Sequence, residues 1–133
     1  MSHESHKHIL NSGGVQSIIE LSQQNSQDCK RRSAASICNL SEFSNGVQHM
    51  VKGGVIPALT ELMNHQDESI IKFTCASLCR LSSSTENCDL IANSGVLPML
   101  VQRSIEGDGD VKKFCGSTFS FLSYYESCRS ILC

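Results

Sequence analysis

The sequence has no tryptophan, only two prolines and few aromatic side chains, which make up 5% of its 133 residues. It also lacks a long hydrophobic run, because no stretch approaches the ~18 apolar residues of a membrane-spanning helix. The amino-terminal residues have no apolar core of the kind that a signal peptide needs. These absences argue against a membrane partner. They predict an intracellular, cytoplasmic protein, with the nucleus as an alternative location.

A surplus of positive charge is also absent. Eleven Lys and Arg residues stand against thirteen Asp and Glu residues, for a net charge of −2. A nucleic-acid-binding surface needs many cations to neutralise phosphates. We therefore expect no nucleic-acid partner, and any recognition by charge must come from the local arrangement of side chains.

A repeat of 41 residues runs through the chain without insertion or deletion. Three columns of the repeat hold identical residues, namely Gly13, Gly54 and Gly95; Leu40, Leu81 and Leu122; and Ser41, Ser82 and Ser123. Apolar character recurs in other columns, such as Ile37, Leu78 and Phe119. The repeat divides a single domain, residues 1–133, into units at about 3–43, 44–84 and 85–125, with a partial fourth unit at about 126–133.

Apolar residues spaced by three and four predict three helices in each unit. In the second unit a short helix at about 45–52 ends at Gly53 and Gly54, and Pro57 lies in the first turn of the next helix. The third and longest helix is predicted to end near Ser41, Ser82 and Ser123. Its predicted N-cap column is Asp28, Ser69 and Asp110. No such helix buries its apolar face alone, so the units must stack into a solenoid.

Two segments resemble the helix signatures of armadillo repeats. Residues 54–63, GVIPALTELM, are similar to the signature of the second helix, and residues 34–41, AASICNLS, to that of the third. The resemblance covers about residues 9–133, although the first unit lacks the proline of the second-helix signature. It implies an all-α, armadillo-type, right-handed superhelical solenoid that serves as a protein-binding scaffold.

The eight cysteines include no C-x-x-C pair, and Cys75 and Cys79 have the spacing of one helix face. Cys29 shares its repeat column with Ile70 and Val111, so its position is one of packing. A free cysteine behaves as a small buried hydrophobe. We expect reduced, structural thiols of an intracellular protein rather than disulfides.

No pattern in the sequence indicates catalysis or a metal site. Three histidines crowd the amino terminus without a cysteine or carboxylate at the spacing of a zinc finger: His3, His6 and His8. Asp108 and Asp110 resemble half of a calcium loop, but the bidentate Glu at its twelfth position is missing. The sequence predicts no enzyme activity, no catalytic residue, no metal and no cofactor.

The resemblance implies that the third helices line a concave groove for an extended peptide. Residues at i, i+4 and i+8 share one side of a helix, so each third helix presents one stripe. The predicted peptide-binding residues are Arg31, Ala35 and Asn39; Lys72, Ala76 and Arg80; and Lys113, Ser117 and Phe121. Each stripe begins with a cation, which suits an acidic ligand. The alternative is that these cations only keep a helix face soluble, and Phe73 and Phe114 beside them could be core residues.

Two binding modes of the armadillo family differ in the side chains of the third helices. Nuclear-import adaptors use ladders of Trp and Asn, but Ala35, Ala76 and Ser117 stand at the Trp positions here, and only Asn39 keeps the amide. A catenin-like basic groove for acidic partners is closer in chemistry. We therefore predict a non-catalytic interaction module that binds an extended, linear peptide of acidic or mixed charge.

A second function stays open because the last unit has no polar cap of the kind that finishes a solenoid. The sequence stops at the apolar residues Ile131, Leu132 and Cys133. Either the chain is a segment of a longer armadillo protein, or its apolar C-terminal face pairs with another copy or a partner. The alternative function is a structural or scaffold segment that works through its end faces.

Overall fold

The computed structural model describes residues 13–132, and the side chains of all of these except 44–45 and 127–132. The histidines His3, His6 and His8 lie outside the described residues. Throughout the described part the regular structure is helical, as the periodicity predicted. The helices are α2 (Gly14–Ser22), α3 (Gln27–Leu40), α4 (Ser44–Lys52), α5 (Val55–Leu62), α6 (Glu68–Ser82), α7 (Thr85–Ala92), α8 (Leu97–Glu106) and α9 (Gly109–Leu132).

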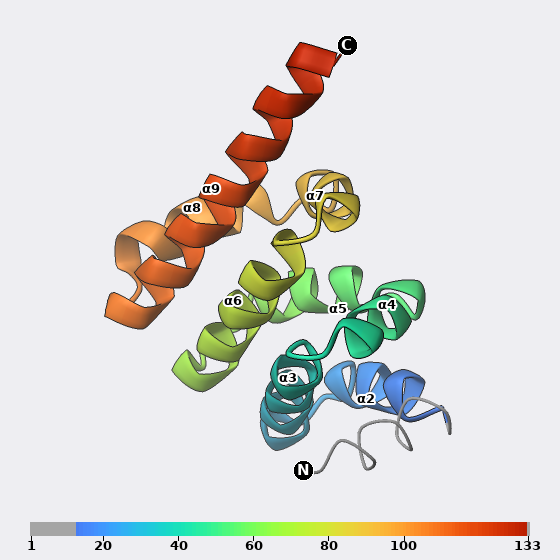
Figure 1. The fold of residues 1–133 in the computed structure, drawn as a ribbon. Helices are drawn as coiled ribbons and strands as arrows, with labels where there is room; N and C mark the ends of the chain where they lie inside the picture. The colour runs from blue at the N-terminus through green and yellow to red at the C-terminus, as the bar shows by residue number, and fades with distance from the viewer. Residues whose placement is uncertain (1–12, 133) are drawn as a thin grey trace.

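The helices follow the repeat of the sequence. α2 and α3 come from the first unit, α4 to α6 from the second, and α7 to α9 from the third. The most extensive packing between units joins α3 to α6 and α6 to α9. Figure 1 shows these third helices following one another along the molecule, with α4 and α7 to one side. The third helices thus form one continuous layer.

The invariant glycine column precedes each second helix. Gly13, Gly54 and Gly95 have backbone φ values of 79°, 96° and 88°, in the left-handed region that residues with a Cβ avoid. No other atom lies within 4 Å of the place where a Cβ on any of them would be. Backbone conformation, rather than crowding, therefore explains why glycine recurs at this position.

One hydrophobic core runs through the described units. Ile37 and Leu78 share a column and are both 0% exposed, while Leu40 and Leu81 share another and are 2% and 0% exposed. Four of the cysteines whose side chains the structure describes are buried: Cys38, Cys75, Cys88 and Cys115. The apolar columns of the repeat are thus packing positions, and the buried cysteines serve as small packing residues, as predicted.

The predicted N-cap column of the third helices is wrong by two residues. The observed caps form a different column, which consists of Ser26, Asp67 and Asp108. Each cap accepts a hydrogen bond from the backbone amide three residues later. The predicted caps lie in the first helical turn instead: Asp28, Ser69 and Asp110. Both columns hold residue types that cap helices well. The backbone is extended at Ser26 and Asp67, as an N-cap requires, so their column provides the caps.

α9 departs from the repeat, because the predicted end near Ser123 is wrong and the helix continues to Leu132. Residues 126–132, predicted to begin a fourth unit, extend this helix. The second unit has the turn formers Ser83 and Ser84 at the corresponding step, whereas the third unit has Tyr124 and Tyr125. The Tyr125 hydroxyl donates a 2.8 Å hydrogen bond to Asp89 on α7, which holds the extension beside that helix.

Candidate functional site

The predicted peptide-binding residues lie along the layer of third helices and differ in exposure. Five are exposed: Arg31, Asn39, Lys72, Lys113 and Phe121. Three are half-buried: Ala35, Arg80 and Ser117. Ala76 is only 6% exposed and offers almost no surface to a ligand. The available face therefore consists mainly of the residues at the two ends of each stripe.

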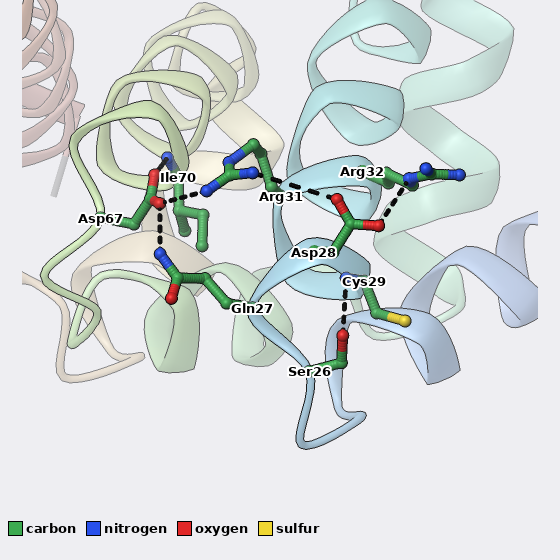
Figure 2. A network of polar contacts seen from close by, with 8 residues as sticks. All are labelled: Ser26, Gln27, Asp28, Cys29, Arg31, Arg32, Asp67 and Ile70. Carbon is green, nitrogen blue, oxygen red and sulfur yellow. Dashed lines mark hydrogen bonds and ion pairs between the residues drawn. The ribbon is translucent and has the colours of Figure 1, made fainter.

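Arg31 is held by an acid of the next unit. Its guanidinium lies 2.7 Å from Asp67, the cap of α6, and Gln27 donates to the same carboxylate oxygen at 2.6 Å. The Ile70 amide donates to the other oxygen, so that Asp67 has three donors (Figure 2). These hydrogen bonds, that of Arg31 first, hold the pKa of Asp67 well below its ordinary value. Arg31 therefore ties α3 to α6.

Asp28 adds a second acid to this network. It lies 3.0 Å from Arg32, one helical turn away, and 3.9 Å from Arg31 (Figure 2). Its side chain is 62% exposed, so both ion pairs face solvent. Exposed pairs of this kind stabilise a helix by only ~0.3–0.5 kcal/mol. Asp28 is therefore the more accessible of the two acids.

Lys72 repeats the arrangement at the next junction. Its ammonium lies 2.9 Å from Asp110, on the first turn of α9. The Asp110 hydrogen bond raises the pKa of Lys72, and Lys72 in turn lowers the pKa of Asp110. The two side chains are 47% and 60% exposed, so water screens this pair. The Lys72 ammonium is therefore paired with Asp110 but still faces solvent.

Arg80 bridges the other end of the same helices. Its guanidinium donates to the Cys38 carbonyl at 2.6 Å and lies 3.3 Å from Glu42. The Cys38 carbonyl belongs to the last turn of α3, where carbonyls have no partner within the helix. Arg80 thus caps the neighbouring third helix, and its role in the structure is more than that of a free surface cation.

Three predicted residues keep their polar or aromatic groups available. Within the described residues, the Asn39 side chain makes no hydrogen bond and Lys113 makes neither a hydrogen bond nor an ion pair. Phe121 is 39% exposed on α9. Asn39, Lys113 and Phe121 are therefore the stripe residues most ready to contact a ligand. Phe73 and Phe114, in contrast, pack half-buried against the core.

Two further cations join helices, and the sequence analysis missed both. Arg103 on α8 donates to the carbonyls of Met63 and His65 at 3.1 and 2.9 Å, and so caps the end of α5 in the previous unit. Lys30 donates to the Ser22 carbonyl at the end of α2. Arg103 stands in the column of Leu21 and Leu62, and this break in an apolar column was the available signal.

A cluster of sulfur atoms lies between α6 and α9. The Cys75 sulfur is 3.9 Å from that of Cys115 and 3.7 Å from that of Met63, and both cysteines are 0% exposed. The hydrogen bond with Cys115 and burial raise the pKa of the Cys75 thiol. A buried protonated thiol is a poor nucleophile, so this cluster serves packing.

A cleft of about 600 Å³ opens beside Arg80, between α4 and the start of α7. Its charged lining is of both signs, from Glu42, Lys52, Arg80 and Glu86. Within the described part of the chain, no group of three or more His, Cys, Asp or Glu side chains is placed to hold a metal ion. No helix described here has both the length and the apolar character needed to cross a membrane.

Comparison with solved structures identifies the architecture. An engineered protein matches with a TM-score of 0.83 at 20% identity, over 92% of this chain and 50% of its own. A designed armadillo repeat protein matches with a TM-score of 0.82 at 18% identity, over 90% of this chain and 51% of its own. Another, in complex with the peptide (KR)4, matches with a TM-score of 0.81 at 17% identity, over 93% and 57%.

The chain thus has an armadillo-like fold, an all-helical solenoid of repeats, and it spans about half the length of these structures. No protein-family model matches the sequence. No curated protein matches it either.

Proposed function

We propose that the chain is a non-catalytic interaction module that binds an extended, acidic, linear peptide along α3, α6 and α9. The observation that carries this proposal is the exposed stripe on adjacent third helices, where Asn39, Lys113 and Phe121 are available for contact. An extended backbone needs donors and acceptors for its amides, and an exposed Asn side chain supplies one of each.

The size of the layer supports a short ligand. Packed helices lie about 8–10 Å apart, so three of them span about 20 Å. An extended chain covers about 3.3 Å per residue, so about six residues cross the layer. The side chains of such a strand alternate between the protein and solvent, so about three of them face the third helices. One contact for each third helix agrees with the spacing of the stripes.

The charge of the ligand follows from the cations of the stripe. Lys113 forms no ion pair with a described acid, although its charge helps to lower the pKa of Asp110, whereas Arg31 and Lys72 are paired with Asp67 and Asp110. The designed armadillo protein whose complex is known holds a peptide of Lys and Arg. This chain has cations on its exposed stripe, so peptide binding carries over to the proposal, while the preferred charge is reversed. Exposed ion pairs contribute only ~0.2–1 kcal/mol each, so Phe121 must supply an apolar anchor.

The distribution of titratable groups supports a binding role rather than catalysis. The described carboxylates with lowered pKa values, Asp67 and Asp110, lie in ion pairs between units. The thiol of Cys75, whose pKa is raised, lies inside the core. An active site would need such groups to converge on one pocket. Here they lie at separate junctions.

A fluorescence-anisotropy titration tests the proposal. The probes are two labelled octapeptides, one of alternating Glu and Leu and the other of alternating Lys and Leu. We expect the acidic peptide to bind at least about tenfold more tightly at low salt and to lose affinity as salt rises. The double substitution Asn39→Ala and Phe121→Ser should weaken its binding by about tenfold or more.

The matched control is Glu61→Gln, on the exposed side of α5 and away from the third helices. It should leave the affinity unchanged. Equal affinity for the two peptides would contradict the acidic preference. An unchanged affinity of the Asn39→Ala, Phe121→Ser variant would contradict the groove itself.

A second candidate function, assembly through the end face of the third unit, has an observation of its own. Within the described residues, all five exposed large hydrophobic side chains come from α7, α8 and α9: Leu90, Val101, Ile105, Phe121 and Tyr124. The third unit thus exposes more large apolar side chains than the described parts of the other two units, and exposed apolar surface marks interaction sites. The nature of the partner is argued below.

A further inference from the structure

The end face of the third unit is built from columns that are buried in the other units. Ile37 and Leu78 are fully buried, but Phe119 in the same column is only partly buried. Leu81 is 0% exposed, and Leu122 in its column is again partly buried. The repeat supplies the same apolar positions in every unit. What changes in the third is the absence of a covering unit among the described residues.

A cleft marks this uncovered face. It has a volume of about 470 Å³ and lies between α7 and α9, with Leu97, Phe119 and Leu122 among its lining residues. Apolar side chains contribute to this lining, whereas the cleft beside Arg80 has four charged residues in its lining. Apolar clefts of this kind are where partners gain binding energy by excluding water.

The ion pairs between units indicate what chemistry should cover the face. At the described junctions, the cation that opens one third helix is paired with an acid at the start of the next third helix. Arg31 pairs with Asp67 and Lys72 with Asp110. Lys113 is the third member of this column and has no such acid among the described residues. The covering element should therefore be a third helix that begins with an accessible acid.

The chain itself presents such a helix at its other end. Asp28 stands in the repeat column of Asp110, on the first turn of α3, and its side chain is 62% exposed. The apolar column of Cys29, Ile70 and Val111 is also less covered in the first unit. Cys29 is half-buried, whereas Ile70 and Val111 are 0% and 4% exposed. The repeat has no insertion or deletion, so the first unit of a second copy fits the register that follows Lys113.

We propose that a second copy of this chain docks head to tail on the end face of the third unit. In this arrangement α3 of the second copy lies beside α9 as α9 lies beside α6. Asp28 of the second copy accepts a hydrogen bond from the Lys113 ammonium. The apolar contact is made by Phe119 and Leu122. This inference rests on the second candidate function above, and it specifies the partner of that end face.

A head-to-tail contact joins two different surfaces, and a copy that docks in the register of the repeat continues the solenoid instead of closing a ring. Each added copy presents a new free end face, and the average mass should rise steadily with concentration. A symmetric dimer would instead reach a plateau at twice the mass of the chain, 14.5 kDa. Light-scattering mass across concentration, without any peptide present, separates these two cases.

Charge reversal at the two partners tests the orientation. Lys113→Asp removes the cation from one face, and Asp28→Lys removes the acid from the other. Each variant alone should associate about threefold to tenfold more weakly, because a favourable pair becomes a repulsive one. An equimolar mixture still has one intact Lys113 face and one intact Asp28 face. The two other faces carry the exchanged charges and also attract each other, so the mixture should regain open-ended association with alternating copies.

The double variant Asp28→Lys, Lys113→Asp should regain open-ended association, since it restores the pair with its charges exchanged. Leu122→Glu should abolish association by placing a charge in the apolar contact. Glu61→Lys, on the exposed side of α5, is the control for charge reversal and should change nothing. Circular dichroism verifies that every variant is folded.

A mass that stays at one chain would overturn both the end-face function and the head-to-tail inference. Association that Leu122→Glu abolishes, but that ends at a symmetric dimer or ignores both charge reversals, would overturn the head-to-tail inference and leave the end-face function standing. The peptide titration is a separate readout, because Asn39→Ala, Phe121→Ser and its control Glu61→Gln leave Asp28, Lys113, Phe119 and Leu122 unchanged.

Discussion

The second and third units of the solenoid share a register but differ in environment. The second unit is covered on both sides, so that Leu78 is fully buried, Lys72 is paired and Asp67 accepts a cation from the first unit. In the third unit, Phe119 is partly exposed and Lys113 has no described partner. The same column can therefore be core or surface, which teaches that the neighbouring unit defines the role of a residue as much as its own unit does.

The largest difference between the two units should appear in their apolar column. Leu78→Ala removes fully buried atoms and should cost about 2–5 kcal/mol of unfolding free energy. Phe119→Ala removes a larger side chain that is only partly buried, and should cost about 1–2 kcal/mol. Urea denaturation followed by circular dichroism measures both. An equal or greater cost for Phe119→Ala would mean that the end face is covered in solution.

The helix caps should show a smaller difference. Asp67→Ala removes the cap of α6 together with the acceptor for Arg31 and Gln27, so we expect a loss of about 1–2 kcal/mol. Asp108→Ala removes the cap bond to the amide of Val111 and a weaker electrostatic interaction with Lys72, and should cost about 1 kcal/mol or less. Thermal denaturation compares the two. The reverse order would show that the Asp67 network contributes nothing beyond its cap.

The fall in unfolding free energy at acid pH should also depend on Asp67. Its pKa is lowered in the folded state, so the folded protein holds fewer protons than the unfolded chain near pH 3. The stabilisation is complete above the unfolded pKa, at about pH 4, and is lost as pH falls below it. Asp67→Asn should therefore flatten the fall in unfolding free energy below about pH 4. A fall as steep as that of the unsubstituted protein would contradict this role.

The smallest expected effect concerns the cations. Lys72→Gln removes an exposed ion pair and should lower the melting temperature slightly at low salt, with no difference at high salt. Lys113→Gln, measured at a concentration where the protein is monomeric, should leave the melting temperature unchanged. A clear loss for Lys113→Gln would reveal an intramolecular partner for this side chain.

The sequence was sufficient for the helical repeat and its packing columns. Helix formation and burial are periodic properties, so the spacing of Leu40, Leu81 and Leu122 carries them along the chain. The stripe of predicted binding residues also lies on the third helices as expected. The partners of those cations could not be predicted. Pairs such as Arg31 with Asp67 join residues 36 positions apart, and the sequence does not show which of several possible partners a cation meets.

The period, the helical class, the glycine turns and the apolar columns were determined by the sequence alone, because each depends on local backbone preferences and on regular burial. Tertiary structure decided which of two polar columns caps the third helices, which cations bridge units, and how far α9 extends. These outcomes depend on the position of neighbouring helices in space. A hydrogen bond forms only where two groups meet within about 3 Å, and an ion pair within about 4 Å, and sequence spacing does not set these distances.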